Sequence, residues 1–485
     1  MTARRHLDPT DLAAVRAAVG LDVAGSRLHD VGLERIVIAR DALDSLPELV
    51  RTALAAAGRL PGAETPSVAV VVDGHPMDRG GADLRALVVD RLEGVADVRM
   101  VVLGTADREL HAEASTIAAA VEAARGAACL VALGSGTICD IVKEASRELG
   151  VADIAVQTAN SVNAFSDDMA VLLIRGVKRT VPSRWPTALL VDLTTIADAP
   201  ARLNRAGVGE LAAMFTAPAD WRLAAAFGMD PTWDPRVVRL FTDGGDALLE
   251  AASAATSPEP DDHRPLVELM TLSGLALGIA GKTSPISGTE HTVSHLLDMV
   301  AAREHTPTGL HGAQVGVAAL AVSVAWQRVL TAIDPVGLVE RPTPSHERML
   351  ARTEDAFGDL DPSGAMAEEC WAQYRLKLER WEAQRPNLPA IVSGWAALRD
   401  DLGEFLGSPQ RVASVLSAAG APARFDELDP AVSREDAAWA LYNGHLIRDR
   451  FTLADLAWFA GTWTPDLVRA SIDEAAAIAA AAGGA

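Results

Sequence analysis

Hydrophobic positions in the first 200 residues form short runs that are separated by helical patterns. Runs of four to six mainly apolar residues are typical of strands that are buried on both faces of a sheet. Helical spacing lies between several of these runs, at 42–57, 82–92 and 109–124. Strands that alternate with helices predict a parallel sheet covered by helices. The predicted strands are 35–38, 67–72, 98–103, 129–133, 153–156, 169–173 and 188–191.

After about residue 200, apolar positions recur at helical spacing and strand-like runs become rare. We therefore expect an α/β domain over residues 1–199 and an all-helical domain over residues 200–485. The clearest helical patterns in the second part cover 235–255, 266–279, 312–333, 365–384 and 436–446.

Composition narrows the class of protein. The formal net charge of −22 offers no basic surface for nucleic acid. The first 20 residues lack the apolar core of a signal peptide, and no run reaches the roughly 18 uncharged apolar residues of a membrane helix. Three cysteines form neither a disulfide framework nor a CxxC metal site. We therefore expect a cytoplasmic protein with no nucleic-acid or membrane partner.

The segment Val131–Ser146, VALGSGTICDIVKEAS, carries the first candidate site. An apolar run ends in a turn containing Gly134 and Gly136, and a helical pattern that includes Asp140 follows. Such a turn can hold a diphosphate, because glycine lets a ligand approach the backbone and the helix N-terminus favours an anion. A purely structural turn, with Thr137 as the helix cap, explains the same residues.

Three further features combine residue types that bind metal. His291 and His295 are four residues apart and would share one face of a helix. His311 opens another helical pattern, and Glu210 follows the glycine-containing segment Gly207–Gly209 at the predicted start of a helix. Each feature alone also has a structural explanation, as a packed histidine or a helix cap. One carboxylate and two histidines, however, would leave coordination positions of a metal open for substrate.

Together these segments resemble the sn-glycerol-1-phosphate dehydrogenase family, within the superfamily of dehydroquinate synthases, glycerol dehydrogenases and iron-containing alcohol dehydrogenases. The resemblance runs from about residue 32 to residue 461. It rests on the ordered motifs GSGTICDIVKEAS, GVKRTVPSRWPTALLVDL, APARLNRAGVGEL followed by TAPADW, SGTEHTVSHLLD, HGAQVG and HLIRDRFTLADLAWFAG. It implies a Rossmann-like nucleotide-binding domain, a helical metal- and substrate-binding domain as in dehydroquinate synthase, and a homodimer. It also implies NAD or NADP and one divalent metal ion, with Zn²⁺ first and Ni²⁺ or Fe²⁺ as alternatives.

The resemblance also assigns residues. Glu210, His291 and His311 would bind the metal. His295 would contact the substrate and serve a proton relay, and Asn163 and Lys282 would also belong to the substrate site. Asp73 follows a predicted strand, where an acid can bind the adenosine ribose. The residues expected to bind the cofactor are Asp73, Gly134, Ser135, Gly136, Thr137, Ile138, Asp140, Thr158, Ser161 and Asp167.

Several positions depart from the family pattern. Asn163 replaces a substrate-binding Asp, Asp167 replaces a Ser, and Glu210 replaces the usual Asp ligand, as in dehydroquinate synthases. Met214 and Ser284 stand at commonly basic positions. We expect a metal-dependent NAD(P)-linked oxidoreductase that acts on the CH–OH group of a small polyol, phosphorylated or otherwise anionic. The alternatives are a dehydroquinate synthase-like cyclase or lyase that uses NAD transiently, and a non-catalytic binding protein.

Overall fold

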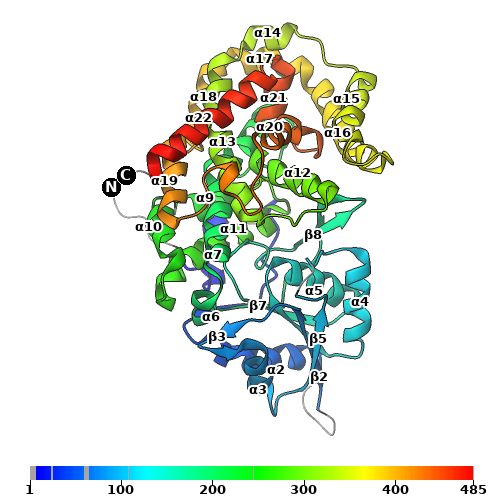
Figure 1. Ribbon diagram of the computed structural model, residues 1–485, viewed down its shortest axis with the longest axis vertical. Coiled ribbons are helices and arrows are strands. Elements are labelled where there is room, and N and C mark those ends of the chain that lie inside the picture. Colours follow the sequence, from blue (N-terminus) through cyan, green and yellow to red (C-terminus); the bar gives the residue numbers. More distant parts are fainter. Residues whose placement is uncertain (1–6, 23–25, 59–64, 107–108, 244, 484–485) are drawn as a thin grey trace. The chain divides into compact units, whose positions relative to one another are not determined.

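A six-stranded parallel sheet forms the centre of the α/β part of the chain (Figure 1). The computed structural model describes residues 7–22, 26–58, 65–106, 109–243 and 245–483. The first 20 residues, where we expect no signal peptide, include residues 1–6, which lie outside the described residues. In sheet order the strands are β1 (Arg35–Ala39), β10 (Ala188–Asp192), β7 (Ala152–Gln157), β6 (Cys129–Gly134), β2 (Ser67–Asp73) and β5 (Asp97–Leu103).

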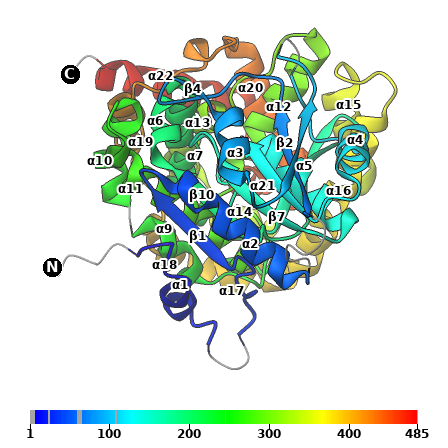
Figure 2. The ribbon, with the colours of Figure 1, turned by 90° about the horizontal axis from the view of Figure 1, so that it is seen from below.

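Helices cover both faces of this sheet, which explains why its strands read as continuous apolar runs. Along β2, Val68, Val70 and Val72 pack in one buried cluster, whereas Ala69 and Val71 pack in another. The first cluster includes residues of α2 (Leu46–Ala56) and α3 (Leu84–Leu92), both visible over the sheet in Figure 2. The second includes residues of α4 (Ala114–Ala124) and α5 (Gly136–Leu149).

All seven predicted strands are present, but 169–173 lies outside the central sheet. It forms β8 (Met169–Ile174), which pairs with β9 (Val177–Pro182) in a separate two-stranded sheet. A second two-stranded sheet joins β3 (Asp78–Arg79) to β4 (Ala82–Asp83). The helix predicted over 82–92 begins two residues later, because the Asp83 carboxylate caps it by accepting the N–H groups of Arg85 and Ala86.

The strand order places a topological switch point between β2 and β6. From β2 the chain continues to β5 at the edge of the sheet, and from β6 it continues to β7 in the opposite direction. In doubly wound sheets, ligands bind outside the carboxyl ends of the strands at such a point. The carboxyl end of β2 is Asp73 and that of β6 is Gly134.

The chain divides into two units, but not at residue 199. Residues 239–283 pack with the α/β part: the Ser166 hydroxyl donates to the carbonyl of Thr271, and the Asn163 side chain donates to Ser273. The helix that carries Thr271 and Ser273 is buried almost all round, so its sequence does not indicate which neighbour it packs against. The first unit is residues up to Ile174, Lys178–Gly207 and Arg239–Thr283; the second is Arg175–Val177, Val208–Val238 and Ser284–Ala485.

The second unit is helical in the described residues, as expected for the later part of the chain. Its helix α13 (His311–Ala332) is long and apolar enough to cross a membrane, but most of it is buried among α12, α19 and α22, as in a core helix. The second unit contains α8 (Ala217–Ala226), α12 (Thr289–Glu304), α13, α14 (Pro335–Glu340), α15 (His346–Gly358), α16 (Ala365–Gln384), α17 (Leu388–Ser393), α18 (Trp395–Gly403), α19 (Pro409–Ala419), α20 (Arg434–Asn443), α21 (Leu453–Ala460) and α22 (Pro465–Gly483). The other helices are α1 (Leu12–Val19), α6 (Leu193–Asp198), α7 (Ala201–Ala212), α9 (Pro235–Thr242), α10 (Gly245–Ala252) and α11 (Arg264–Ala280).

Candidate functional site

The glycine turn after β6 has the geometry of an anion-binding site. Helix α5 begins immediately after the strand, and its N-cap Ser135 makes no side-chain hydrogen bond to the helix among the described atoms. A Cβ at Gly134 would lie 2.8 Å from the Cβ of Ile138, and a Cβ at Gly136 would lie 2.7 Å from Cγ2 of Val162. Both positions therefore need glycine, and the N–H groups of the first helical turn are available for an anion.

Several predicted cofactor residues gather around this turn. The Thr158 N–H donates to the carbonyl of Gly134 at 3.3 Å, and Ser161 lies on the same segment after β7. Asp73 ends β2, which pairs directly with β6. Its Oδ1 accepts the N–H of His75 at 2.9 Å, which leaves Oδ2 for a ligand hydroxyl. Three neighbouring strands thus bring these residues to one edge of the sheet.

Two other predicted cofactor residues have internal partners. Asp140 is buried and its Oδ2 accepts the N–H of Val171 at 3.1 Å, so this carboxyl group binds β8. Burial raises the pKa of Asp140 to about 7. Asp167 is also buried, and its Oδ1 lies 2.5 Å from Nζ of Lys143 on α5. Each carboxyl group thus links a neighbouring segment to α5.

The residues expected at the substrate site lie in different units. Asn163 is buried in the first unit, where its Nδ2 donates to Oγ of Ser273 at 3.3 Å. Lys282 follows α11 in the same unit. Met214 and Ser284, which stand at positions that are commonly basic in the family, are both buried in the second unit.

The three predicted metal ligands come together in the second unit. Glu210 lies on α7, His291 on α12, and His311 is the first residue of α13. Nε2 of His291 is 3.4 Å from Oε1 of Glu210, and Nε2 of His311 is 3.8 Å from Oε2. One ligand atom from each residue lies within 4.8 Å of the other two. Glu210 and His291 are buried, whereas the His311 side chain is 25% exposed, so the group is open on one side.

The prediction that Glu210 begins a helix is wrong, because it lies near the end of α7. The neighbouring glycines serve helix packing instead of a turn. A Cβ at Gly209 would lie 2.2 Å from the carbonyl oxygen of Gly312, and one at Gly316 would lie 2.7 Å from Cα of Gly209. The absence of side chains at these positions lets α7 approach α13 closely, which brings Glu210 to His311.

The electrostatics of this group fit a divalent cation. Oε2 of Glu210 is buried and has no hydrogen-bond partner among the described atoms. Burial alone would raise the pKa of Glu210, but the charge and hydrogen bond of His291 hold that pKa below its ordinary value. Burial would likewise lower the pKa of His291, but Glu210 and Glu290 raise it to about 9. A carboxylate with two imidazoles and an open position is the donor set of catalytic zinc and related metals.

Two residues that orient the ligand histidines were not identified from the sequence. Oε1 of Glu290 lies 3.0 Å from Nδ1 of His291, so it fixes this ring with Nε2 facing Glu210. Oγ of Ser294 lies 2.7 Å from Nδ1 of His311 and donates to Oε1 of Gln314 at 2.6 Å. In the sequence, the one indication of this role was that Glu290 directly precedes His291 and that Ser294 follows it by three residues, close to one helical turn.

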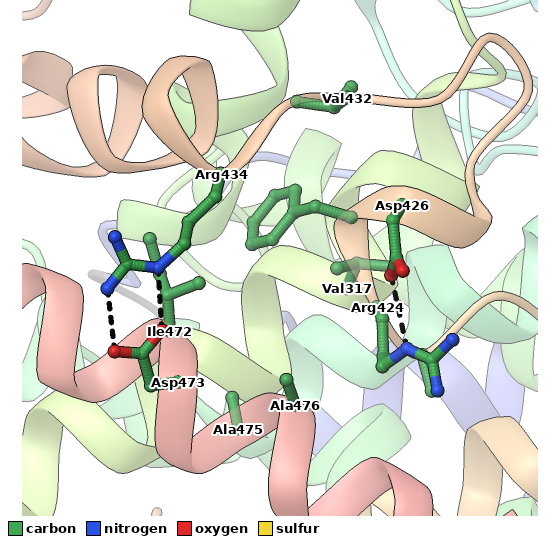
Figure 3. A pocket seen from close by; sticks show the side chains of 11 residues that line it. Val317, Arg424, Asp426, Val432, Arg434, Ile472, Asp473, Ala475 and Ala476 are labelled. Atoms are coloured by element: carbon green, nitrogen blue, oxygen red, sulfur yellow. Dashed lines mark hydrogen bonds and ion pairs between the residues drawn. The ribbon is translucent and has the colours of Figure 1, made fainter.

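A cavity of about 260 Å³ lies elsewhere in the second unit (Figure 3). Its walls are mainly apolar, and its charged side chains pair with one another, Arg434 with Asp473 and Arg424 with Asp426. None of the three candidate metal ligands lines it. The cavity offers space but no unpaired group for chemistry among the described side chains that line it.

Comparison with known proteins shows that the chain is similar to metabolic dehydrogenases. Residues 37–200 match the family model described as iron-containing alcohol dehydrogenase. The chain is 29% identical over 324 residues to glycerol-1-phosphate dehydrogenase [NAD(P)+] of Bacillus licheniformis, covering 66% of this chain and 77% of that protein. It is 26% identical over 432 residues to the enzyme of the same name from Bacillus subtilis, covering 88% of this chain and 92% of that protein.

Solved structures share the fold at low sequence identity. A probable glycerol dehydrogenase from Sinorhizobium meliloti superposes with a TM-score of 0.55 at 16% identity, over 94% of this chain and 99% of that one. Glycerol dehydrogenase from Schizosaccharomyces pombe gives a TM-score of 0.55 at 14% identity, over 93% and 91%. The chain is thus similar to iron-containing alcohol dehydrogenases over residues 37–200, and to glycerol-1-phosphate dehydrogenases over most of its length.

Proposed function

We propose that this protein is a metal-dependent, NAD(P)-linked oxidoreductase that acts on the CH–OH group of a small, anionic polyol. The observation that carries the proposal is the convergence of Glu210, His291 and His311, with ligand atoms within 4.8 Å of one another. The relatives named glycerol-1-phosphate dehydrogenase [NAD(P)+] support a phosphorylated polyol and a nicotinamide cofactor.

The metal would be held by the carboxylate of Glu210 and by Nε2 of His291 and His311. When bound, it would supply Lewis-acid polarisation of the substrate oxygen. Glu290 and Ser294 hold the two rings in place, so the donor atoms are oriented before the ion arrives. We propose Zn²⁺ as the resident ion, because one carboxylate and two imidazoles form a donor set of catalytic zinc. Ni²⁺ and Fe²⁺ are alternatives, because this donor set suits them as well.

The dinucleotide would be held at the glycine turn, with its diphosphate at the N-terminus of α5 and a ribose hydroxyl at Asp73. When bound, it would supply the hydride acceptor or donor. Gly134 and Gly136 allow close approach of the backbone, and Thr158 fixes the neighbouring segment against the turn.

A direct spectrophotometric assay of NAD(P)H tests this function. The metal-loaded protein would be mixed with NAD+ or NADP+ and glycerol 1-phosphate, or with NADH or NADPH and dihydroxyacetone phosphate. Unphosphorylated polyols and the corresponding phosphonates would be assayed in parallel. We expect a change in NAD(P)H absorbance that is lost in Glu210→Ala and retained in the exposed control Glu259→Ala. No turnover with any of these compounds by metal-loaded protein would contradict the proposal.

One observation favours a second candidate. The carboxylate ligand is Glu210, and the family resemblance associates glutamate at this position with dehydroquinate synthases. Such an enzyme would oxidise and re-reduce one sugar phosphate without net production of NADH. Mass spectrometry of the product, with enzyme-bound NAD and no accumulation of NADH, would identify this reaction.

We also propose that the protein is a cytoplasmic homodimer without a nucleic-acid or membrane partner. Its net charge of −22 and the family resemblance support this proposal. Light scattering coupled to size-exclusion chromatography would test the dimer, since a monomer of 50.8 kDa is easily distinguished from it.

A further inference from the structure

Three histidines cluster on α12 and α13, but only two contribute to the metal group. The ring centroid of His295 lies 5.5 Å from that of His311, close to the 5.2 Å between His291 and His311. Proximity alone therefore does not separate His295 from the ligands. The hydrogen bonds at the ring nitrogens do.

In both ligand histidines the Nδ1 atom is the donor. Nδ1 of His291 faces the Glu290 carboxylate, which only accepts hydrogen bonds when ionised. The Ser294 hydroxyl gives its single proton to Oε1 of Gln314, so it accepts the proton on Nδ1 of His311. In each ring, Nε2 is left to face Glu210 and to bind a metal.

His295 has the opposite arrangement. Its Nδ1 lies 2.9 Å from Nη2 of Arg448. A guanidinium group carries only donors, so Nδ1 of His295 must be the acceptor. The ring proton of neutral His295 is therefore on Nε2, and this nitrogen has no lone pair for a metal.

The backbone next to Arg448 is held by side chains of α16. The backbone carbonyl of Asp449 accepts a hydrogen bond from Arg380, and that of Arg450 accepts one from Lys377 at 3.1 Å. Lys377 is itself buried and paired with Asp455 at 2.8 Å. The residues that immediately follow Arg448 are thus tied to α16 by two cationic side chains.

We propose that Arg448 is a positioning residue that holds His295 in the Nε2–H tautomer. It keeps His295 off the metal and makes this side chain a hydrogen-bond donor to the reacting oxygen of the substrate. Because the guanidinium occupies Nδ1, the ring does not pass protons from one nitrogen to the other, in contrast to the relay expected from the sequence. This inference rests on the proposed metal-dependent function.

The tautomer can be observed directly by long-range ¹H–¹⁵N spectra of zinc-loaded protein labelled at histidine. The His295→Ala variant assigns the signals of His295. We expect a protonated Nε2 and an unprotonated Nδ1 in the wild type and in Arg448→Lys, because lysine also only donates. We expect loss of this pattern in Arg448→Ala, with Arg434→Ala, an exposed arginine of the same unit, as the unaffected control. A protonated Nδ1 in the wild type, or an unchanged pattern in Arg448→Ala, would overturn the inference.

Kinetics provide a second readout. We expect Arg448→Ala to lower kcat by about 10- to 100-fold without loss of bound zinc, since the donor is misplaced but the ligands are intact. His295→Gln retains an N–H donor and should keep more activity than His295→Ala, whereas equal losses would indicate a proton relay and contradict the inference. The spectra require no turnover, so an inactive enzyme with the expected tautomer would contradict the proposed function alone.

Discussion

The Nζ atom of Lys143 lies 2.5 Å from Oδ1 of Asp167, and neither side chain is exposed. The same ammonium group donates to the carbonyl of Ala164 at 2.7 Å and to that of Met169 at 2.8 Å. One buried cation on α5 therefore holds the segment that follows β7, which contains the residues gathered at the glycine turn.

Replacing Lys143 with Met should destabilise the protein by about 3–5 kcal/mol, because Asp167 would remain buried without its counter-ion. Urea unfolding measures the loss. The double variant Lys143→Met/Asp167→Asn should recover part of it, since the uncompensated charge is removed. The exposed ion pair between Arg434 and Asp473 gives the matched control, because Arg434→Ala should lower the free energy of unfolding by no more than about 1 kcal/mol. Equal costs for the buried and exposed pairs would contradict a role for the buried charge.

The buried carboxyl group of Asp140 should make stability depend on pH. Burial raises its pKa from an ordinary 3.8 to about 7, although Lys143 opposes the shift and Asp167 adds to it. Between these values the unfolded chain releases the proton while the folded protein keeps it, so stability falls as pH rises from about 4 to 7. The loss is at most about 4 kcal/mol, at about 1.4 kcal/mol per pKa unit.

The Asp140→Asn variant should therefore show a weaker decline of the unfolding midpoint from pH 4 to pH 7 than the wild type. Thermal unfolding followed by circular dichroism at several pH values measures the difference. Asp78→Asn, at an exposed aspartate of the same unit, should follow the wild-type curve. Parallel curves for wild type and Asp140→Asn would rule out this carboxyl group as a source of the pH dependence.

Ser294→Ala should weaken zinc binding by about 10- to 100-fold, because His311 loses the acceptor that fixes its ring. Competition with a chelator of known affinity measures the change. Ser323→Ala is the matched control, since Ser323 is a buried serine on α13 whose hydroxyl donates to the carbonyl of Leu320 in the same helix. An unchanged zinc affinity in Ser294→Ala would show that the ring is held by other contacts.

Gly136→Ala should weaken NAD(P)H binding by about tenfold or more, about 1.4 kcal/mol, while zinc affinity stays the same. The added Cβ would lie 2.7 Å from Cγ2 of Val162 and would push the segment after β7 away from the turn. Fluorescence titration with NADH and NADPH measures the affinity. Gly358→Ala adds a methyl group in open space and serves as the control. Normal cofactor affinity in Gly136→Ala would argue against this turn as the diphosphate site.

The sequence predicted the strands well because their burial on both faces leaves uninterrupted apolar runs. It also predicted that His291 and His295 share a helix and that another helix begins at His311, since helical spacing and helix boundaries are local properties. It did not predict that α11 packs in the first unit, because that helix is apolar on all sides. The contact of Arg448 with His295 joins residues 153 positions apart, and no local pattern reports such a pair.

One helical turn of α12 places His291, Ser294 and His295 together, each facing a different partner. Insertion or deletion of one residue within that turn would rotate the following side chains by about 100° about the helix axis. The helix can therefore diverge over evolution by substitution but not by change of length. The connection 305–310 is free of this constraint, because the glycine contact between α7 and α13 aligns His311 independently. Length variation among descendants of this gene should accordingly accumulate in connections such as 305–310 and spare α12.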